Sequence, residues 1–276
     1  MSELSTERPD PTTQTTIDGL APYARALSDY LEGRPDGVLY LENLDREPGV
    51  DPAAETRALP VAVFFRAADQ LLPFEVRALD ACRGVVADLG AGAGPHSLAL
   101  QGRGFEVVAV EVSAAVCEVL RRRGVERVVE ADAVEDDLAA ALGGRVDTLL
   151  LMMNGFGMLG DLEALRRWLR RAHTWLRPGG QILADGIDLE ANRPEWVAER
   201  RRRHPERYPG ETRVRMRYDD LSAESRWLGV DPQTLGRIAN DAGWRTELLE
   251  QRDDGVYLAR LSAATQAGDS KPVGGV

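Results

Sequence analysis

The most constraining feature of this chain is the segment 85–94, an apolar run that ends in an acid and three alternating glycines. The run has the composition of a strand buried on both faces, and the glycines let the backbone turn tightly beneath a ligand. Pro95 suits the first turn of a helix, where an N–H donor is not needed. The sequence therefore predicts a strand, a glycine-rich loop and a helix in succession, which is typical of a nucleotide-type cofactor site.

The spacing of the glycines excludes two common nucleotide-binding motifs. A dinucleotide motif G-x-G-x-x-G that starts at Gly90 or Gly92 needs a glycine at the place of Pro95 or Ser97. A Walker phosphate loop needs Gly-Lys-Ser/Thr, and the only lysine of the chain is Lys271. Neither a dinucleotide fingerprint nor a phosphate loop is present.

The segment resembles the first motif of the class I S-adenosylmethionine-dependent methyltransferases, an acid followed by glycines at alternate positions. In this chain Asp88, Gly90, Gly92 and Gly94 match it. The resemblance covers roughly residues 64–262 and implies S-adenosyl-L-methionine as the cofactor.

Further motifs follow in the order expected of that family. Glu111 closes an apolar run and resembles the acid that accepts hydrogen bonds from the ribose hydroxyls. Asp132 follows a third strand and resembles the adenine-binding acid, and the loop 153–157 resembles the place of the methionine part and the substrate. Residues 176–180 resemble the turn before the fifth strand. The cofactor-binding set implied by the resemblance is Asp88, Gly90, Ala91, Gly92, Glu111, Val112, Asp132, Ala133, Met153 and Asn154.

The alternation of elements after residue 84 predicts an α/β fold with a mostly parallel sheet. Sequential strand and helix units imply right-handed crossovers between parallel strands. A tight turn at 253–255 joins two strands near 245–251 and 256–261, which must be antiparallel. We therefore expect the Rossmann-like class I methyltransferase sheet, whose last strand is antiparallel. The strands are expected near 84–89, 105–111, 128–131, 146–153 and 181–185.

Five segments are expected along the chain. Residues 1–17 predict a disordered lead, 18–82 an N-terminal helical cap, 83–262 the methyltransferase core and 263–276 a disordered tail. The segment 190–230 is expected to be an insertion in the core, a helix followed by a β-hairpin. Insertions at the carboxyl edge of such a sheet lie over the ligand crevice, so we expect a substrate lid.

Two groups of arginines in the insertion leave two interpretations open. The run Arg200–Arg203, followed by His204 and Arg207, is either a solvated helix face with ion pairs or a recognition patch. Strict alternation over 212–218 places Arg213, Arg215 and Arg217 on one strand face. That face either binds an acidic substrate or pairs with Glu224 and neighbouring acids, and the ion-paired interpretation is favoured for both groups.

No catalytic residue can be named from the sequence. Methyl transfer to an amine or thiol needs mainly alignment and exclusion of water, whereas a hydroxyl or carbon acceptor would need a base. Arg66 either meets the cofactor carboxylate or is a surface arginine beside the packed pair Phe64 and Phe65. His96 either points toward the cofactor or packs at the helix start, and Asp185 and Asp188 either face the acceptor or cap turns.

Composition limits the compartment and the partners. No apolar stretch approaches about 20 residues and the start of the chain is polar, so we expect a cytoplasmic protein without a membrane segment. Cys82 and Cys117 are expected to be packed in helices rather than in a disulfide or a metal site. The net charge of −11 argues against a nucleic-acid partner. The loop Asn154-Gly155-Phe156-Gly157 also departs from the Asn/Asp-Pro-Pro-aromatic motif of the members that methylate base amino groups.

Three functions are consistent with these observations. The first is a methyltransferase that acts on a small molecule in a lidded pocket. The second is a methyltransferase of a macromolecule, RNA or protein, that docks through the arginines of the insertion. The third is a non-catalytic module that binds S-adenosylmethionine. The oligomeric state is left open.

Overall fold

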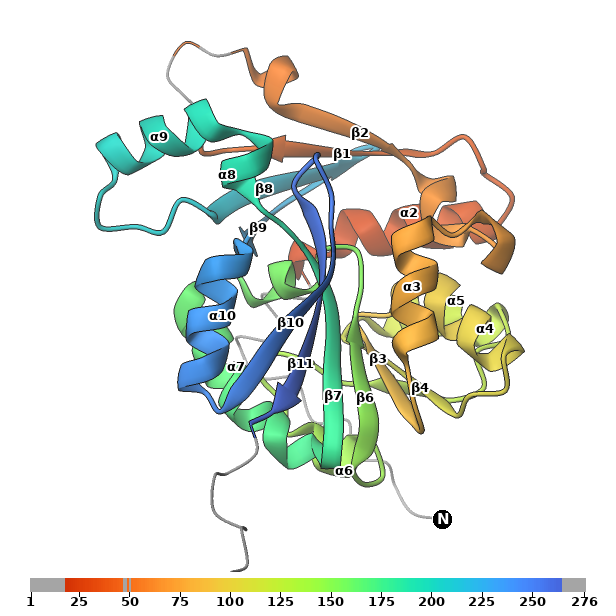
Figure 1. Ribbon diagram of the computed structural model, residues 1–276. Helices are drawn as coiled ribbons and strands as arrows, with labels where there is room; N and C mark the ends of the chain where they lie inside the picture. Colours follow the sequence, from red (N-terminus) through yellow and green to blue (C-terminus); the bar gives the residue numbers. More distant parts are fainter. Residues whose placement is uncertain (1–17, 47–48, 50, 265–276) are drawn as a thin grey trace, which may run out of the picture.

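The computed structural model describes residues 18–46, 49 and 51–264, which form two β-sheets with helices around them (Figure 1). The larger sheet has the strand order β10-β11-β7-β6-β3-β4-β5, and the smaller one, above it in Figure 1, has the order β2-β1-β8-β9. The predicted disordered lead lies outside the described residues. So does the predicted tail, except for Ala263, which belongs to β11, and Ala264.

The larger sheet is parallel except at one strand. β11 pairs antiparallel with both β7 and β10, while the other neighbours run parallel. The fold class is therefore the predicted one. The strands are β3 (Val86–Leu89), β4 (Val107–Glu111), β5 (Val128–Glu130), β6 (Val146–Leu151), β7 (Leu176–Ile187), β10 (Trp244–Gln251) and β11 (Val256–Ala263).

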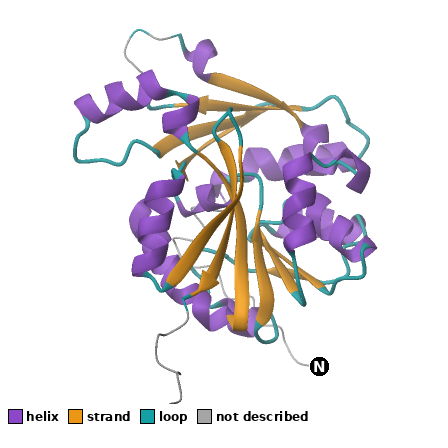
Figure 2. Ribbon diagram, viewed as in Figure 1, coloured by secondary structure: helices purple, strands orange, loops and turns teal. Residues whose placement is uncertain are grey.

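Helices cover both faces of the larger sheet, as Figure 2 shows. α3, α4 and α5 lie on one side, and α7 and α10 on the other (Figure 1). These elements and the short α6 are α3 (Pro73–Ala81), α4 (Pro95–Gly102), α5 (Ala114–Arg122), α6 (Leu138–Ala141), α7 (Leu162–Trp175) and α10 (Pro232–Asp241). The main core contains Trp168, Trp175 and Trp244, which are almost fully buried. Three indole rings remove a large apolar area from water, so they anchor α7 and β10 firmly to each other.

The predicted turn at 176–180 lies inside a strand. β7 starts at Leu176, and its register with β6 shifts between the pairs Val146↔Leu176 and Thr148↔Gln181. Gly179, with φ of +79°, takes the left-handed conformation that the irregularity needs. The Pro-Gly-Gly sequence therefore forms a bulge in the strand rather than a turn before it.

The N-terminal extension is not only helical, which corrects the prediction for residues 18–82. It contains α2 (Ala21–Leu31) and α3, but also β1 (Val38–Asn43) and β2 (Thr56–Pro60), with short 3₁₀ helices η1 (Pro52–Glu55), η2 (Val61–Phe65) and η3 (Ala68–Gln70). β1 pairs with β2 on one side and with β8 of the insertion on the other. Because β8 lies far along the chain, no local pattern predicts this pairing.

The insertion has the predicted order of helix and hairpin. It comprises α8 (Leu189–Asn192), α9 (Pro194–Arg203), β8 (Glu211–Tyr218) and β9 (Leu221–Leu228). Glu211 accepts a hydrogen bond from the N–H of Leu162 at 3.0 Å, and the ring of Trp227 lies against Gly157 in η4 (Gly155–Leu159). The hairpin is thereby docked onto the loop that follows β6.

The contact between Trp227 and Gly157 yields a stability prediction. A Cβ atom on Gly157 would overlap the Trp227 ring, so Gly157→Ala should destabilise the chain by about 1–3 kcal/mol. The control is Gly236→Ala in α10, where a Cβ meets nothing within 4 Å. That change should stabilise the chain by about 0.5–1 kcal/mol because alanine favours the helix. Denaturant unfolding measures both, and equal stabilities of the two variants would contradict this docking.

Candidate functional site

Buried carboxylates gather at one edge of the larger sheet. Asp88 is the last residue but one of β3, Glu111 ends β4, Asp132 follows β5, and Asp185 lies near the end of β7. Their exposed fractions are 2%, 5%, 2% and 5%. The carboxyl ends of parallel strands form the edge where open α/β sheets bind ligands.

The glycine loop after β3 adopts the conformation that its sequence predicts. Gly90, Gly92 and Gly94 have φ of +70°, +57° and +79°, which other residues rarely adopt. A Cβ on Gly92 would overlap the hydroxyl of Tyr23 in α2, and one on Gly90 would lie 3.0 Å from the terminal methyl of Met158. The loop 90–94, which we call the glycine cradle, therefore presents mainly bare backbone, and Tyr23 and Met158 cover it.

The first two acids support this loop from below. Glu111 accepts hydrogen bonds from the N–H groups of Gly92 at 3.1 Å and Val112 at 3.0 Å. Asp88 accepts one from the Ser97 hydroxyl at 2.6 Å. Burial raises the pKa of both carboxyls, and these hydrogen bonds act against it.

Tyr23 was missed by the sequence analysis as a site residue. Burial and the nearby Glu111 carboxylate raise the pKa of its hydroxyl, so it stays protonated as a donor. The sequence signal was the helical spacing of residues 20–31, which reports a buried face without saying what that face covers.

The loop after β5 is tied down by its own backbone. One carboxylate oxygen of Asp132 accepts from the N–H groups of Val134 at 2.8 Å and Glu135 at 3.3 Å. The carbonyl of Ala133 accepts from the Trp168 indole N–H at 2.8 Å. The two predicted residues Asp132 and Ala133 are thus brought to the site edge and held against α7.

The loop after β6 is strained. Met153 and Asn154 have φ of 63° and 60°, although neither is glycine. Such residues cost of order 1 kcal/mol each and cluster at ligand sites. The N–H of Asn154 donates to Asp185 at 2.9 Å, while its side-chain oxygen is buried without a protein partner.

A charged cluster lies beside this loop. Arg66 forms a two-pronged ion pair with Glu75, with both N–O distances 2.7 Å. Nε2 of His96 lies 3.0 Å from the same carboxylate, and the N–H of Leu72 donates to it at 2.7 Å. Burial raises the pKa of Glu75, but these partners outweigh it and lower the value to about 2. Arg66 therefore contacts Glu75, a partner that neither interpretation of Arg66 named, and His96 is packed at the start of α4, as one of its two interpretations predicted.

In contrast to Glu75, at Asp185 the effect of burial on the pKa outweighs that of the hydrogen bonds and charges. Burial raises its pKa to about 6, although the N–H of Asn154 and the nearby His96 oppose the rise. Glu75 adds to it by repulsion. The carboxyl is ionised at neutral pH, but at a cost to stability.

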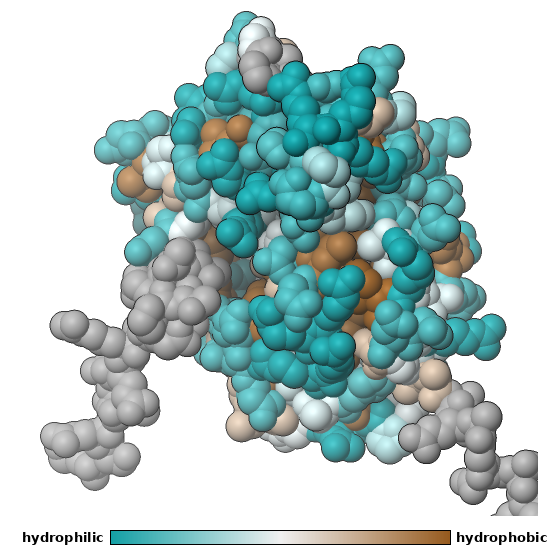
Figure 3. Space-filling model, turned by 90° about the vertical axis from the view of Figure 1, so that its left-hand side faces the viewer, coloured by the Kyte–Doolittle hydropathy of each residue, from teal (hydrophilic) through white to brown (hydrophobic). Residues whose placement is uncertain are grey.

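The arginines of the insertion are ion-paired. Arg215 contacts Glu42 at 3.1 Å and Glu224 at 2.6 Å, and Arg213 contacts Asp45 at 3.3 Å. The guanidinium of Arg217 lies 5.7 Å from the centroid of the Tyr40 ring. Within α9, Arg200 pairs with Asp45, Arg201 with Glu190, and Arg202 and Arg203 with Glu199. Figure 3, which faces the side that carries α9 and α10, shows a mostly hydrophilic surface with small apolar patches.

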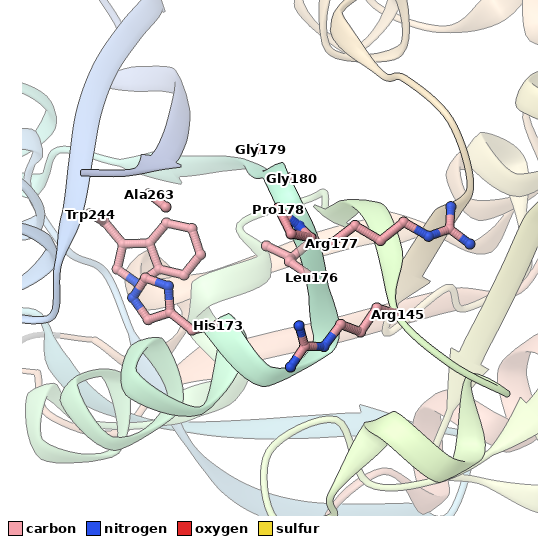
Figure 4. A pocket seen from close by; sticks show the side chains of 9 residues that line it. All are labelled: Arg145, His173, Leu176, Arg177, Pro178, Gly179, Gly180, Trp244 and Ala263. Carbon is pink, nitrogen blue, oxygen red and sulfur yellow. The ribbon is translucent and has the colours of Figure 1, made fainter. Parts of the chain in front are cut away.

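Two surface recesses lie away from this edge. The one in Figure 4 is at the amino ends of β6 and β7, where His173 stacks on Trp244 with ring centroids 3.9 Å apart. The other lies between α9, the segment after β1 and the start of β8, and its lining includes Arg46, Arg200 and Arg213. Among the described residues, no group of histidine, cysteine or acidic side chains could hold a metal ion, and no helix is long and apolar enough to span a bilayer.

Comparisons with known proteins identify the family. A family model described as a methyltransferase domain matches residues 86–180. The crystal structure of an S-adenosylmethionine-dependent methyltransferase from Bacteroides fragilis, in complex with S-adenosyl-L-homocysteine, is 31% identical, with a TM-score of 0.75. The match covers 91% of this chain and 96% of that one. The chain belongs to the S-adenosylmethionine-dependent methyltransferases.

Two further relatives are more distant. The cypemycin N-terminal methyltransferase from a Streptomyces species is 34% identical over 104 residues, which are 37% of this chain and 42% of that protein. The CcbJ methyltransferase from Streptomyces caelestis is 19% identical, with a TM-score of 0.51, over 69% of this chain and 87% of that one, and it shares the fold. This methyltransferase is thus a class I enzyme whose cofactor is S-adenosyl-L-methionine, as predicted from its motifs.

The residues at the sheet edge fit that cofactor. The glycine cradle presents backbone without side chains, and Asp88 and Glu111 lie in the last two residues of the neighbouring strands β3 and β4. The unpartnered side-chain oxygen of Asn154 offers a further acceptor at the loop after β6.

Glu111 gives a binding prediction. Glu111→Ala removes a charged hydrogen-bond acceptor, so it should weaken S-adenosylmethionine binding by about 1–3 kcal/mol. Calorimetry measures the change, with Glu118→Ala on the exposed face of α5 as the matched control. Unchanged affinity would remove Glu111 from the site.

Asp185 gives a pH-dependent prediction. A carboxyl whose pKa is raised to about 6 on folding contributes stability below its unfolded pKa, near 4, and loses it as the pH rises through 6. Asp185→Asn should therefore be more stable than the natural chain above pH 6, by up to about 3 kcal/mol for a shift of about two units. The gain should disappear at pH 4. Thermal unfolding across this range tests it, and a variant less stable at pH 8 would refute it.

Proposed function

We propose that this methyltransferase transfers a methyl group to a small-molecule acceptor by in-line displacement beneath a lid. The observation that carries the proposal is the small sheet over the carboxyl edge of the larger one (Figure 1). It combines β1 and β2 of the N-terminal extension with β8 and β9 of the insertion. Its docking through Trp227 and Glu211 places it against the loop after β6. A site beneath such a sheet suits a small acceptor better than a macromolecular chain.

We assign the cofactor contacts to the predicted residues. Glu111 and Val112 would receive the ribose, and Asp132 and Ala133 the adenine. Asp88 and the loop Gly90-Ala91-Gly92 would receive the amino-acid part together with Met153 and Asn154. The support is the burial of the three acids and the bare cradle between them.

The protein contributes mainly by aligning the two reactants and by excluding water from the site. S-adenosylmethionine, when bound, supplies an electrophilic methyl group on a positively charged sulfur. Tyr23 and Met158 cover the cradle and keep water from it, and the strained loop at Met153 and Asn154 sets the direction from which an acceptor approaches. Alignment of this kind can provide most of the acceleration of a displacement reaction.

A nucleic-acid acceptor is disfavoured by the charges. The net charge is −11, and the arginines of α9 and β8 named above are engaged with acids or an aromatic ring. A peptide amino terminus is a second candidate, because of the similarity to the cypemycin N-terminal methyltransferase. A cytoplasmic location also belongs to the proposal, since Cys82 and Cys117 are both buried and free.

Methylation of fractionated cell extract tests the size of the acceptor. The enzyme is incubated with methyl-labelled S-adenosylmethionine and extract that ultrafiltration has divided into metabolites and macromolecules. We expect the label in the metabolite fraction, at a rate that changes little with salt. Label confined to the macromolecules, with a rate that falls steeply as salt rises, would favour a nucleic acid instead.

A further inference from the structure

Asp185 is a buried acid that the cofactor assignment does not use. It lies in β7 beside the loop after β6, and one of its oxygens accepts the Asn154 N–H. The side-chain oxygen of Asn154, buried and without a protein partner, belongs to the same loop. Asp185 thus lies against the loop where the methyl acceptor is expected, and its hydrogen bond from Asn154 brings it no positive charge.

The charged groups around Asp185 leave its charge without a cation of its own. His96 of α4 is near, but its Nε2 is directed at Glu75 of α3. Both terminal nitrogens of the Arg66 guanidinium donate to Glu75. From β11, the hydroxyl of Tyr257 donates to the carbonyl of Val230 instead. Among the described residues, no ion pair joins Asp185 to an arginine or histidine.

A buried carboxylate without a cation is a binding site for one. Isolated buried charges cost several kcal/mol and are normally paired. An ammonium group supplies a charge and up to three N–H donors, which suits the Asp185 carboxylate. A thiol would have to form its anion beside a carboxylate, which repulsion opposes. A hydroxyl is too weak an acid for a carboxylate to deprotonate efficiently.

We propose that Asp185 binds the methyl acceptor as an ammonium group and receives its proton, so that the substrate of this enzyme is an amine. This assignment rests on the proposed function. The ammonium N–H bond breaks and its proton moves to a carboxylate oxygen of Asp185, which leaves a neutral amine. The nitrogen lone pair forms the new N–C bond to the methyl group while the C–S bond breaks, and its electron pair stays on sulfur. The products are a methylated ammonium ion and S-adenosylhomocysteine.

The first test measures ligand binding without turnover. Methylammonium chloride is titrated into the enzyme with bound S-adenosylhomocysteine at pH 8, against sodium chloride at equal ionic strength and against methanol. We expect only methylammonium to raise the unfolding midpoint, saturably and by about 2–4 °C. The shift should vanish in Asp185→Asn and persist in Asp188→Asn, an acid that caps α8. Absence of the shift in the natural chain, or its persistence in Asp185→Asn, overturns the assignment.

The second test separates this role from two others. S-adenosylhomocysteine should bind Asp185→Asn with unchanged affinity, whereas a loss of about tenfold or more would mean that Asp185 holds the ammonium of the cofactor instead. With the acceptor from the extract experiment, Asp185→Asn should lose about 100-fold in turnover.

The position of the label distinguishes a failure of the amine assignment from a failure of the proposed small-molecule function. Label on oxygen, carbon or sulfur of a small product overturns the amine and leaves the proposed function intact. Label confined to macromolecules overturns the small-molecule function, and the methylammonium titration still decides the role of Asp185.

Discussion

The burial of four carboxylates at one edge of a parallel sheet is the constraint on which the rest of this structure depends. Each carboxylate would prefer water, so each must be offset locally. Glu111 and Asp132 are offset by backbone N–H groups, and Asp88 by the Ser97 hydroxyl. Asp185 accepts the N–H of Asn154, and its pKa nevertheless stays raised because burial outweighs its favourable contacts. The incomplete compensation of Asp185 lowers the stability of the fold. A carboxylate whose burial were fully compensated would gain less from binding a ligand.

The charged cluster next to the site shows that two neighbouring buried acids are compensated to very different extents. Glu75 holds an arginine, a histidine and a backbone N–H, and its pKa falls to about 2. Asp185, near the same histidine, has a pKa raised to about 6. The two acids differ because Arg66 and His96 are directed at one of them. Glu75 stabilises α3 and the segment before it, and Asp185 is left for a ligand.

The smaller sheet is built from two parts of the chain that lie far apart in sequence. The N-terminal extension supplies Tyr23, β1 and β2, and the insertion supplies β8 and β9. Because β1 pairs with β8, the extension that carries Tyr23 and the insertion that carries Trp227 are joined through one sheet.

The amino-acid sequence by itself determined the parallel sheet, its reversed strand, the glycine cradle and the acids at the strand ends. These follow from local patterns: apolar runs, glycine spacing and a tight turn between Gln251 and Val256. Only the tertiary structure decided that residues 38–60 add strands to the insertion, that Tyr23 covers Gly92, and that Arg66 pairs with Glu75. The physical reason is that backbone pairing and ion pairing between distant segments depend on which groups meet in space. A local pattern along the chain does not say which distant residues lie close together.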